Sequence, residues 1–336
     1  MTLALLTAVE ALAYVTTGST QDLYYWLDTD TGVLRLYGYG KSANYNGEWN
    51  YGNSGRVPWY NYRPYITSVV VEEGVTEIGA ALFYGCNNLT DVQLPSSLKT
   101  INYEAFRGCS NLEEITIPSG VVTIEDRWVT DCDNLKYIYV SEDNSSYASI
   151  DGILYTKDMT TIVKMPENTP VTEYSIPEGV TSMATDAIYE AKNIINVVLP
   201  TTMSRIQYGC FDNCPQLVSF TLRNCNAPTL EKAVTGSPKL SVVSVPCGCN
   251  GNYSSGYWAN LSSKVNEKNV VMVNARANDP ELGSVTVDLP ECDEDEVSIF
   301  AIPSDVGVFD HWSDDETNTD PDRVINAGQD ETIDLI

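Results

Sequence analysis

The chain has 336 residues, of which 43% are hydrophobic and 19% charged, a composition typical of globular proteins with a sizeable core. Its 46 acidic residues outnumber its 19 basic residues, so the formal net charge at pH 7 is -27. This charge repels nucleic-acid phosphates and anionic lipid headgroups, and we therefore expect no nucleic-acid partner. The single histidine, His311, leaves most histidine-dependent catalytic and metal sites without enough suitable side chains.

The first residues form a short apolar run, Leu3–Val15, that ends near the small residues Ala11-Leu12-Ala13. This resembles the cleavage region of a secretory signal, but no Lys or Arg precedes the run and Glu10 interrupts it. Residues 1–21 are therefore open to three interpretations: a clipped signal, an added start, or a first helical turn. Since no apolar run reaches the roughly 18 residues that span a bilayer, we expect no membrane insertion.

A repeat of 23 residues dominates the sequence. It is visible in three columns: Cys86, Cys109 and Cys132; Leu89, Leu112 and Leu135; Ile78, Ile101 and Ile124. One unit, Asn88–Cys109, reads NLTDVQLPSSLKTINYEAFRGC, and its opening L-x-x-V-x-L matches the leucine-rich-repeat frame. We therefore predict a repeat solenoid of 23-residue coils whose stacked strands form a parallel β-sheet face.

The repeat is suspended between Val140 and Val171. In this interval Asp151-Gly152 lies between two extended runs, followed by a second turn at Lys157-Asp158 and another apolar strand. This order predicts a hairpin inserted at about residues 141–171, after which the chain rejoins the stack.

The repeat units from VEEGVTEIGAALFYGC to SGVVTI resemble the BspA-like leucine-rich repeats, and GILYTKDMTTIVKMP is similar to an insertion that such proteins often carry. WLDTDTGVLRLYGYG (residues 26–40) resembles the hairpin cap that often precedes these repeats. VPCGCNGNYSSGYWANLSSKVNE resembles the closing strand and cap that follow them. The resemblance covers about residues 22–269 and implies an architecture rather than a ligand.

From Val270 the sequence changes to short strands with acidic loops. Its Phe309–Asp314 element, FDHWSD, resembles the F-x-x-W-S-D element of an internalin-type B-repeat, although Asp315 replaces the usual glycine. This implies a small β-grasp-like domain. The expected organisation is a leader (1–21), an N-terminal β-hairpin cap (22–65), repeats (66–246), a C-terminal cap (247–269) and the small domain (270–336).

The nine cysteines fall into two groups. Cys86, Cys109, Cys132 and Cys214 recur in one column with parallel side chains, a poor arrangement for disulfides, so we interpret them as buried thiols that fill a tight turn. Cys225, Cys247 and Cys249 are spaced to meet in neighbouring coils, and this allows one disulfide whose pairing stays open.

Acidic segments suggest weak calcium binding but lack the spacing of a calcium loop. Asp28–Gly32 has no later acidic ligand and fits a β-turn, while Asp293–Glu296 and Asp314–Glu316 fit solvated loops. We therefore expect no metal centre and no cofactor.

Strand alternation predicts two outward columns on the sheet face. The candidate binding residues in these columns are Asp91, Gln93, Glu114, Thr116, Tyr137, Tyr139, Glu173, Ser175 and Asn196. Tyr137 and Tyr139 are the only aromatic pair, and tyrosine is enriched at interfaces. Two alternatives remain: the polar residues only solvate the strands, or the two rings only pack beneath the inserted hairpin.

The BspA-like resemblance implies a bacterial surface or secreted protein, extracellular and non-catalytic, that binds a host or cell-surface protein or glycan. A structural spacer or assembly component, such as a surface stalk, pilus tip or phage tip, is the alternative. A carboxylate glycosidase needs only two acidic residues, but stacked coils offer an open face rather than an enclosing cleft. We therefore predict no enzymatic activity.

Overall fold

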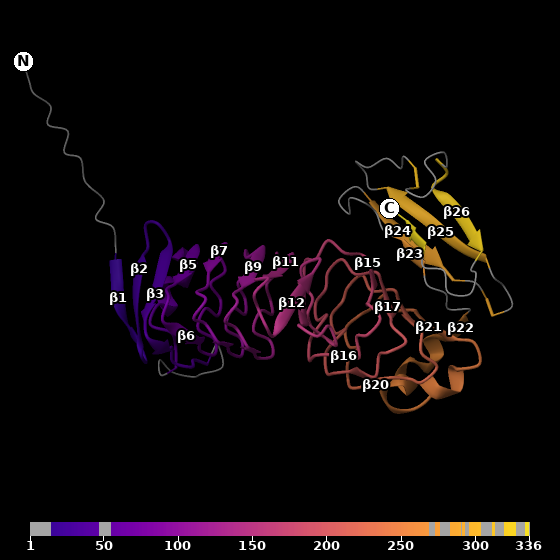
Figure 1. Cartoon of the computed structure of the whole chain (residues 1–336), viewed down its shortest axis with the longest axis horizontal. Helices are drawn as coiled ribbons and strands as arrows, with labels where there is room; N and C mark the ends of the chain where they lie inside the picture. Colours follow the sequence, from indigo (N-terminus) through magenta and orange to yellow (C-terminus); the bar gives the residue numbers. More distant parts are fainter. Residues whose placement is uncertain are drawn as a thin grey trace, which may run out of the picture. The chain divides into compact units, whose positions relative to one another are not determined.

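The computed structural model describes residues 15–46, 55–268, 273–275, 283–289, 291–292, 296–303, 311–312, 319–326 and 333–335. The protein is a parallel-strand solenoid of about nine turns with coils of about 23 residues, as the repeat predicts (Figure 1). The chain divides into two units between Cys132 and Asp133. The expected leader falls largely on residues 1–14, which lie outside the described residues.

The first unit begins with antiparallel strands that continue into the repeat sheet. The strands along one side of this unit are β1 (Val15–Thr20), β2 (Leu23–Asp28), β3 (Val33–Gly38), β5 (Ser68–Val71), β7 (Asp91–Gln93) and β9 (Glu114–Ile117). β1 pairs with β2 and β2 with β3 as hairpins, and β3 then pairs in parallel with β5. The hairpin cap and the first repeats therefore share one sheet.

One boundary of the expected organisation is corrected. We assigned Val15–Thr20 to the leader, but these residues form the outer strand of the cap and pair with β2 along their whole length. The buried Thr20 fixes this strand, because its Oγ1 accepts hydrogen bonds from Ala43 N at 3.1 Å and from the Tyr45 hydroxyl at 2.6 Å.

A second parallel sheet runs along the other side of the coils in this unit. It consists of β4 (Gly40–Lys41), β6 (Val75–Ile78), β8 (Thr100–Ile101) and β10 (Thr123–Ile124), and a short 3-10 helix, η1 (Tyr60–Tyr65), precedes β5. Between consecutive coils lies an aromatic ladder made of Trp59, Phe83, Phe106 and Trp128, with ring centroids 6.2, 5.1 and 6.4 Å apart. Each coil thus buries a ring that it could not bury alone.

The second unit contains the inserted hairpin and the later coils. Its strands are β11 (Tyr137–Val140), β12 (Tyr147–Ile150), β13 (Ile153–Thr156), β14 (Thr161–Lys164), β15 (Glu173–Ser175), β16 (Ser182–Met183), β17 (Asn196–Leu199), β18 (Arg205–Ile206), β19 (Ser219–Leu222), β20 (Thr229–Leu230), β21 (Val242–Pro246) and β22 (Val265–Lys268). β12 and β13 pair antiparallel around Asp151-Gly152, as the sequence predicts. β14 then pairs in parallel with β16, and β18 and β20 continue this sheet of short strands in the second unit.

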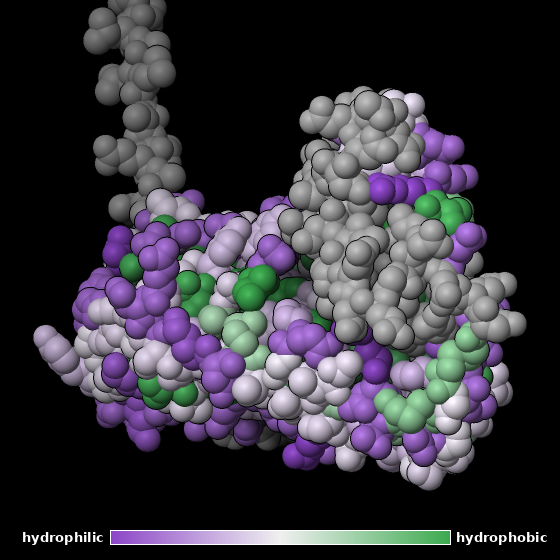
Figure 2. Space-filling model, turned by 45° about the vertical axis from the view of Figure 1, so that its right-hand side comes forward, coloured by the Kyte–Doolittle hydropathy of each residue, from purple (hydrophilic) through white to green (hydrophobic). Residues whose placement is uncertain are grey.

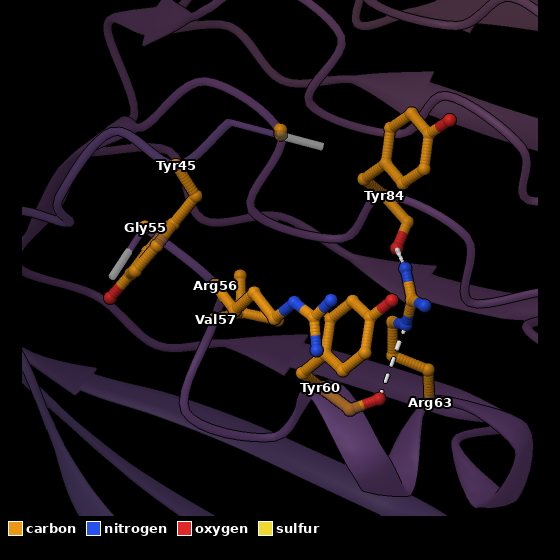
Figure 3. A pocket seen from close by; sticks show the side chains of 8 residues that line it. Tyr45, Gly55, Arg56, Val57, Tyr60, Arg63 and Tyr84 are labelled. Atoms are coloured by element: carbon orange, nitrogen blue, oxygen red, sulfur yellow. Dashed lines mark hydrogen bonds between the residues drawn. The ribbon is translucent and has the colours of Figure 1, made fainter. Parts of the chain in front are cut away.

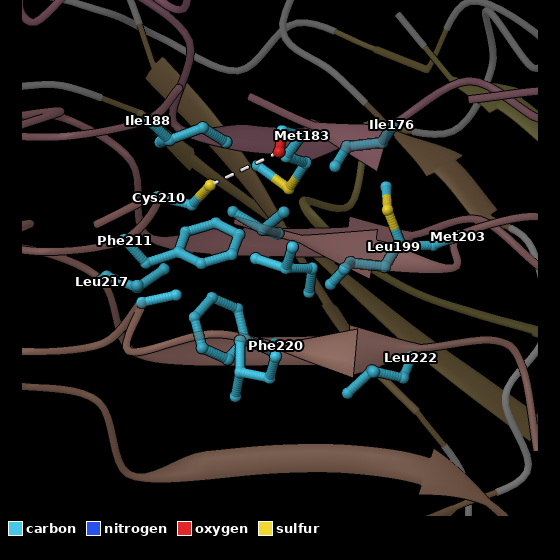
Figure 4. Packing of buried hydrophobic residues seen from close by; sticks show 14 of the residues in the cluster. Ile176, Met183, Ile188, Leu199, Met203, Cys210, Phe211, Leu217, Phe220 and Leu222 are labelled. Atoms are coloured by element: carbon cyan, nitrogen blue, oxygen red, sulfur yellow. Dashed lines mark hydrogen bonds between the residues drawn. The ribbon is translucent and has the colours of Figure 1, made fainter. Parts of the chain in front are cut away.

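The core of the second unit lies between its two parallel sheets. Side chains from β17 and β19 meet those of the turns opposite, and the rings of Phe211 and Phe220 pack with centroids 4.5 Å apart (Figure 4). The buried Sγ of Cys210 approaches the carbonyl of Met183 in the preceding coil. Apolar burial across neighbouring coils is the main stabilising contribution here.

Two 3-10 helices close the later coils. They are η2 (Asn250–Tyr253) and η3 (Gly256–Lys264), and β22 follows them and pairs in parallel with β21. Trp258 anchors the cap, because its ring meets Tyr253 edge to face and its Nε1 donates to Pro228 O at 2.7 Å. The tryptophan thus covers the apolar end that the last coil would otherwise expose.

The C-terminal segment contains five strands among its described residues. β24 (Gly283–Asp288), β25 (Glu296–Pro303) and β26 (Asp322–Asn326) are antiparallel, and β23 (Val273–Ala275) pairs in parallel with β27 (Ile333–Leu335). Trp312 is buried and donates from Nε1 to Asp320 O at 2.8 Å. Most of the two acidic runs expected here lies outside the described residues, and the internalin-type interpretation stays a prediction.

Candidate functional site: the parallel sheet face

In the first unit, the outward positions of β7 and β9 are polar and exposed. Asp91 and Gln93 lie on β7, and Glu114 and Thr116 lie on β9. Asp91 Oδ2 accepts hydrogen bonds from Ser68 Oγ at 2.9 Å and from Gln93 Nε2 at 3.1 Å. These bonds orient Asp91 on the surface, and its remaining acceptor capacity suits hydrogen-bond donors or a cationic group.

In the second unit, the two tyrosines of β11 stack on each other outside the core. Their ring centroids are 5.8 Å apart and the planes differ by 19°. Tyr139 is 41% exposed, whereas Tyr137 is half-buried. A Cβ added to Gly152 of the hairpin turn would lie 2.7 Å from Tyr137 Cδ1. The hairpin thus packs against Tyr137, while Tyr139 presents a ring that Tyr137 supports from below.

A ladder of polar side chains crosses three neighbouring strands of the same unit. Glu173, Asn196 and Ser219 occupy matching positions in the parallel register of β15, β17 and β19. Asn196 Nδ2 donates to both carboxylate oxygens of Glu173 at 2.8 Å, and Ser219 Oγ donates to Asn196 Oδ1. All three side chains are half-buried, so the ladder is hydrogen-bonded and still partly accessible to solvent.

The electrostatics of this ladder differ from those of an ordinary surface carboxylate. Burial raises the pKa of Glu173 to about 7, and the hydrogen bonds from Asn196 oppose that rise. Ser175, the other predicted residue of β15, is half-buried. The ladder therefore combines a carboxyl that changes charge near neutral pH with fixed amide and hydroxyl groups.

The column cysteines are buried thiols that bond to neighbouring coils. The Sγ atoms of Cys109, Cys132 and Cys214 donate to the carbonyls of Phe83, Phe106 and Ile188, at 3.4, 3.2 and 3.1 Å. Burial raises the pKa of the Cys86, Cys210 and Cys214 thiols to about 12. A thiol with so high a pKa is neither a nucleophile nor a ready metal ligand at neutral pH.

Four cysteines form disulfides near the C-terminal cap. Cys225 bonds to Cys249, and Cys247 bonds to Cys292. The sequence reasoning brought the first three together but missed Cys292, which lies outside the repeat frame. The odd total of nine cysteines leaves five free, all of them buried.

Residues 59–168 and 164–263 match the family model of the BspA type leucine rich repeat region, in six copies. The match spans more than half of the chain. The chain belongs to this family. BspA-type repeat proteins are typically bacterial cell-surface or secreted proteins, and repeat proteins of this kind are generally non-catalytic.

Several solved structures resemble this BspA-type chain. A leucine-rich repeat protein from Eubacterium ventriosum is 22% identical, with 70% of this chain and 80% of that chain covered and a TM-score of 0.45. A leucine rich cell surface protein from Faecalibacterium prausnitzii is 18% identical, with 75% and 94% covered and a TM-score of 0.42. The pneumococcal vaccine antigen PcpA is 15% identical, with 68% and 87% covered and a TM-score of 0.41. No curated protein matches the chain.

The described part of this BspA-type chain has neither a cluster of metal ligands nor a membrane-spanning helix. It contains no group of three or more His, Cys, Asp or Glu side chains placed to hold a metal ion. Within the same ranges, no helix has both the length and the apolar character needed to cross a bilayer.

Proposed function

We propose that this protein is a bacterial surface or secreted adhesion or host-interaction protein that binds a host or cell-surface protein or glycan through its parallel sheet face. The observation that supports this most is the stacked pair on β11, where Tyr139 is 41% exposed above Tyr137. A supported aromatic ring offers a large contact area at a low cost in side-chain entropy. The BspA-type family membership agrees with this role.

The exposed face also carries the polar character that such contacts need. In the coloured part of the view in Figure 2, hydrophilic and intermediate side chains predominate, and hydrophobic ones lie in small separate areas. A partner would therefore meet isolated aromatic anchors within a polar, largely acidic surface, and cationic protein patches or sugar hydroxyls match that chemistry.

The test is a binding screen of the full chain against matrix proteins and glycans, followed by single variants. We expect Tyr139→Ala to lower affinity at least tenfold and to leave the melting temperature unchanged. The matched control is Tyr208→Ala, because Tyr208 is 42% exposed in the same unit but lies outside the parallel sheet. Equal affinity of the two variants, or no binding of any ligand by folded protein, would contradict the proposal.

The competing function is a structural spacer for the C-terminal domain. Removal of residues 270–336 separates the two, because a spacer loses its function together with its passenger. Since Cys292 bonds to Cys247, the truncated chain should also carry Cys247→Ser. A panel of polysaccharides incubated with the full chain tests the third class, a glycosidase, by the release of product.

A further inference from the structure

A small hollow in the first unit has a charge opposite to that of the chain as a whole. It is open to solvent and is walled by Tyr45, Arg56, Tyr60, Arg63 and Tyr84 (Figure 3). Among the described residues that line it there are two arginines and no carboxylate, in a chain of formal charge -27.

These two arginines differ from others in the protein by their partners. Arg35, Arg107, Arg205 and Arg223 each pair with a carboxylate. No carboxylate of the described residues pairs with Arg56 or Arg63, and both instead lie over the Tyr60 ring, with Cζ 4.1 and 3.8 Å from its centroid. Figure 3 shows this ring between the two guanidinium groups. Two guanidinium groups that have no carboxylate partner among the described residues thus flank one ring, an arrangement that an anion would stabilise.

The two guanidinium groups have different degrees of freedom. Arg63 is held in place, because Nε donates to Tyr60 O at 3.2 Å and one terminal nitrogen donates to Tyr84 O at 3.0 Å. Gly85 keeps this position open, since a Cβ there would lie 2.8 Å from the same nitrogen. Arg56 is exposed and makes no hydrogen bond to a described residue.

The remaining wall is aromatic. Tyr45 is fixed by the hydrogen bond from its hydroxyl to Thr20, and Tyr84 closes the opposite side (Figure 3). Tyrosine rings stack on the C–H faces of sugars, and arginine binds carboxylates through two parallel hydrogen bonds. An acidic peptide side chain would use only the second of these features, whereas an acidic sugar uses both.

We propose that this hollow binds the carboxylate-bearing sugar of an acidic glycan. Arg56 would bind the carboxylate, Arg63 on the other side of the Tyr60 ring would add positive charge, and a tyrosine ring would stack on the pyranose face. This site lies in the N-terminal cap and the first repeats, and it does not depend on the role proposed for the sheet face.

The test is calorimetric titration of the full chain with galacturonic acid and, as the neutral counterpart, galactose. We expect galacturonic acid to bind, galactose to bind at least tenfold more weakly, and the binding to weaken when sodium chloride is raised from 50 to 500 mM. Arg56→Ala should lower affinity at least tenfold with an unchanged melting temperature, and Arg56→Lys should restore part of it. Arg35→Ala is the control, because it removes an exposed arginine of the same unit that pairs with Glu72.

Three results would overturn the proposal. The first is equal affinity for galactose and galacturonic acid. The second is unchanged galacturonic acid binding by folded Arg56→Ala. The third is equal binding of acetate or an acidic tripeptide, which would make the hollow a general carboxylate site without sugar selectivity.

Discussion

Asn196 holds Glu173 through a single nitrogen, whose two hydrogen bonds reach both carboxylate oxygens at 2.8 Å. The two residues are direct neighbours in the parallel register of β17 and β15. Burial raises the pKa of this carboxyl to about 7, so the folded protein keeps a proton here at pH values where the unfolded chain has lost it.

This relationship predicts a pH-dependent change in stability. Between the unfolded pKa of roughly 4.3 and a folded pKa of about 7, the folded state binds more protons at Glu173. The contribution of Glu173 to the free energy of unfolding therefore falls as pH rises through this window. We expect the free energy of unfolding of Glu173→Gln to be higher than that of wild type by on the order of 1 kcal/mol at pH 8. At pH 4 this difference should disappear.

Urea denaturation at pH 4, 6 and 8 measures the difference between the two proteins. The control is Glu114→Gln, an exposed carboxylate of the first unit, whose effect should stay within about 0.5 kcal/mol at every pH. A difference between Glu173→Gln and wild type that does not change with pH would show that this carboxyl titrates normally.

The two stacked tyrosines should differ in how much they contribute to stability. Tyr137→Ala removes the ring that contacts the hairpin at Gly152, and we expect it to lower the free energy of unfolding by about 1–3 kcal/mol. Tyr139→Ala should cost less than about 1 kcal/mol, because the ring is largely exposed. Thermal denaturation compares them, and an equal loss would mean that the hairpin packs on both rings.

Phe106 is the ring through which the aromatic ladder of the first unit continues from Phe83 to Trp128. Phe106→Ala should lower the free energy of unfolding by about 3–5 kcal/mol, since it leaves a cavity between coils that pack only on their neighbours. Tyr103→Ala, at an exposed ring in the same coil, should change it by less than about 1 kcal/mol. Guanidinium denaturation followed by tryptophan fluorescence reports the result, and similar midpoints for both variants would refute it.

The cysteines predict a labelling pattern. In the native protein at pH 7.5, iodoacetamide should modify none of the five buried thiols, because burial raises the pKa of Cys86, Cys210 and Cys214 to about 12 and raises that of Cys109 well above its ordinary value. After unfolding without reductant it should modify five cysteines, and with reductant nine. Intact mass spectrometry counts the labels, and a native protein that takes up label rapidly would contradict this burial.

The sequence predicts most features of the repeated coils and few of the features outside them. The 23-residue spacing and the two-residue alternation are enough to align Cys109 with Cys132 and to direct Asp91 and Gln93 outward. They could not identify β1, because VTTGST has little apolar alternation and is recognised only through its pairing with β2. Cys292 was missed for a related reason, since a disulfide partner outside the repeat has no column to mark it.

The chemistry of the surface was harder to predict than its orientation. The raised pKa of Glu173 depends on what surrounds its carboxyl, and alternation alone gives only the face on which it lies. The arginine hollow joins Tyr45, Tyr60 and Tyr84 from three segments with no common spacing. Periodicity identifies neighbours one coil apart, whereas both of these features depend on groups brought together by the folded chain.

The inserted hairpin lengthens one coil, and the coils that follow it still pair regularly. β14 places Ile162 beside Met183, and Met183 in turn lies beside Ile206, so the parallel pairing of the second unit is regular from β14 onward. A segment of different size between β11 and β14 would leave these downstream partners unchanged, provided that a strand returned to the same place. One coil of this protein can therefore take a longer segment while the pairing of the following coils stays the same.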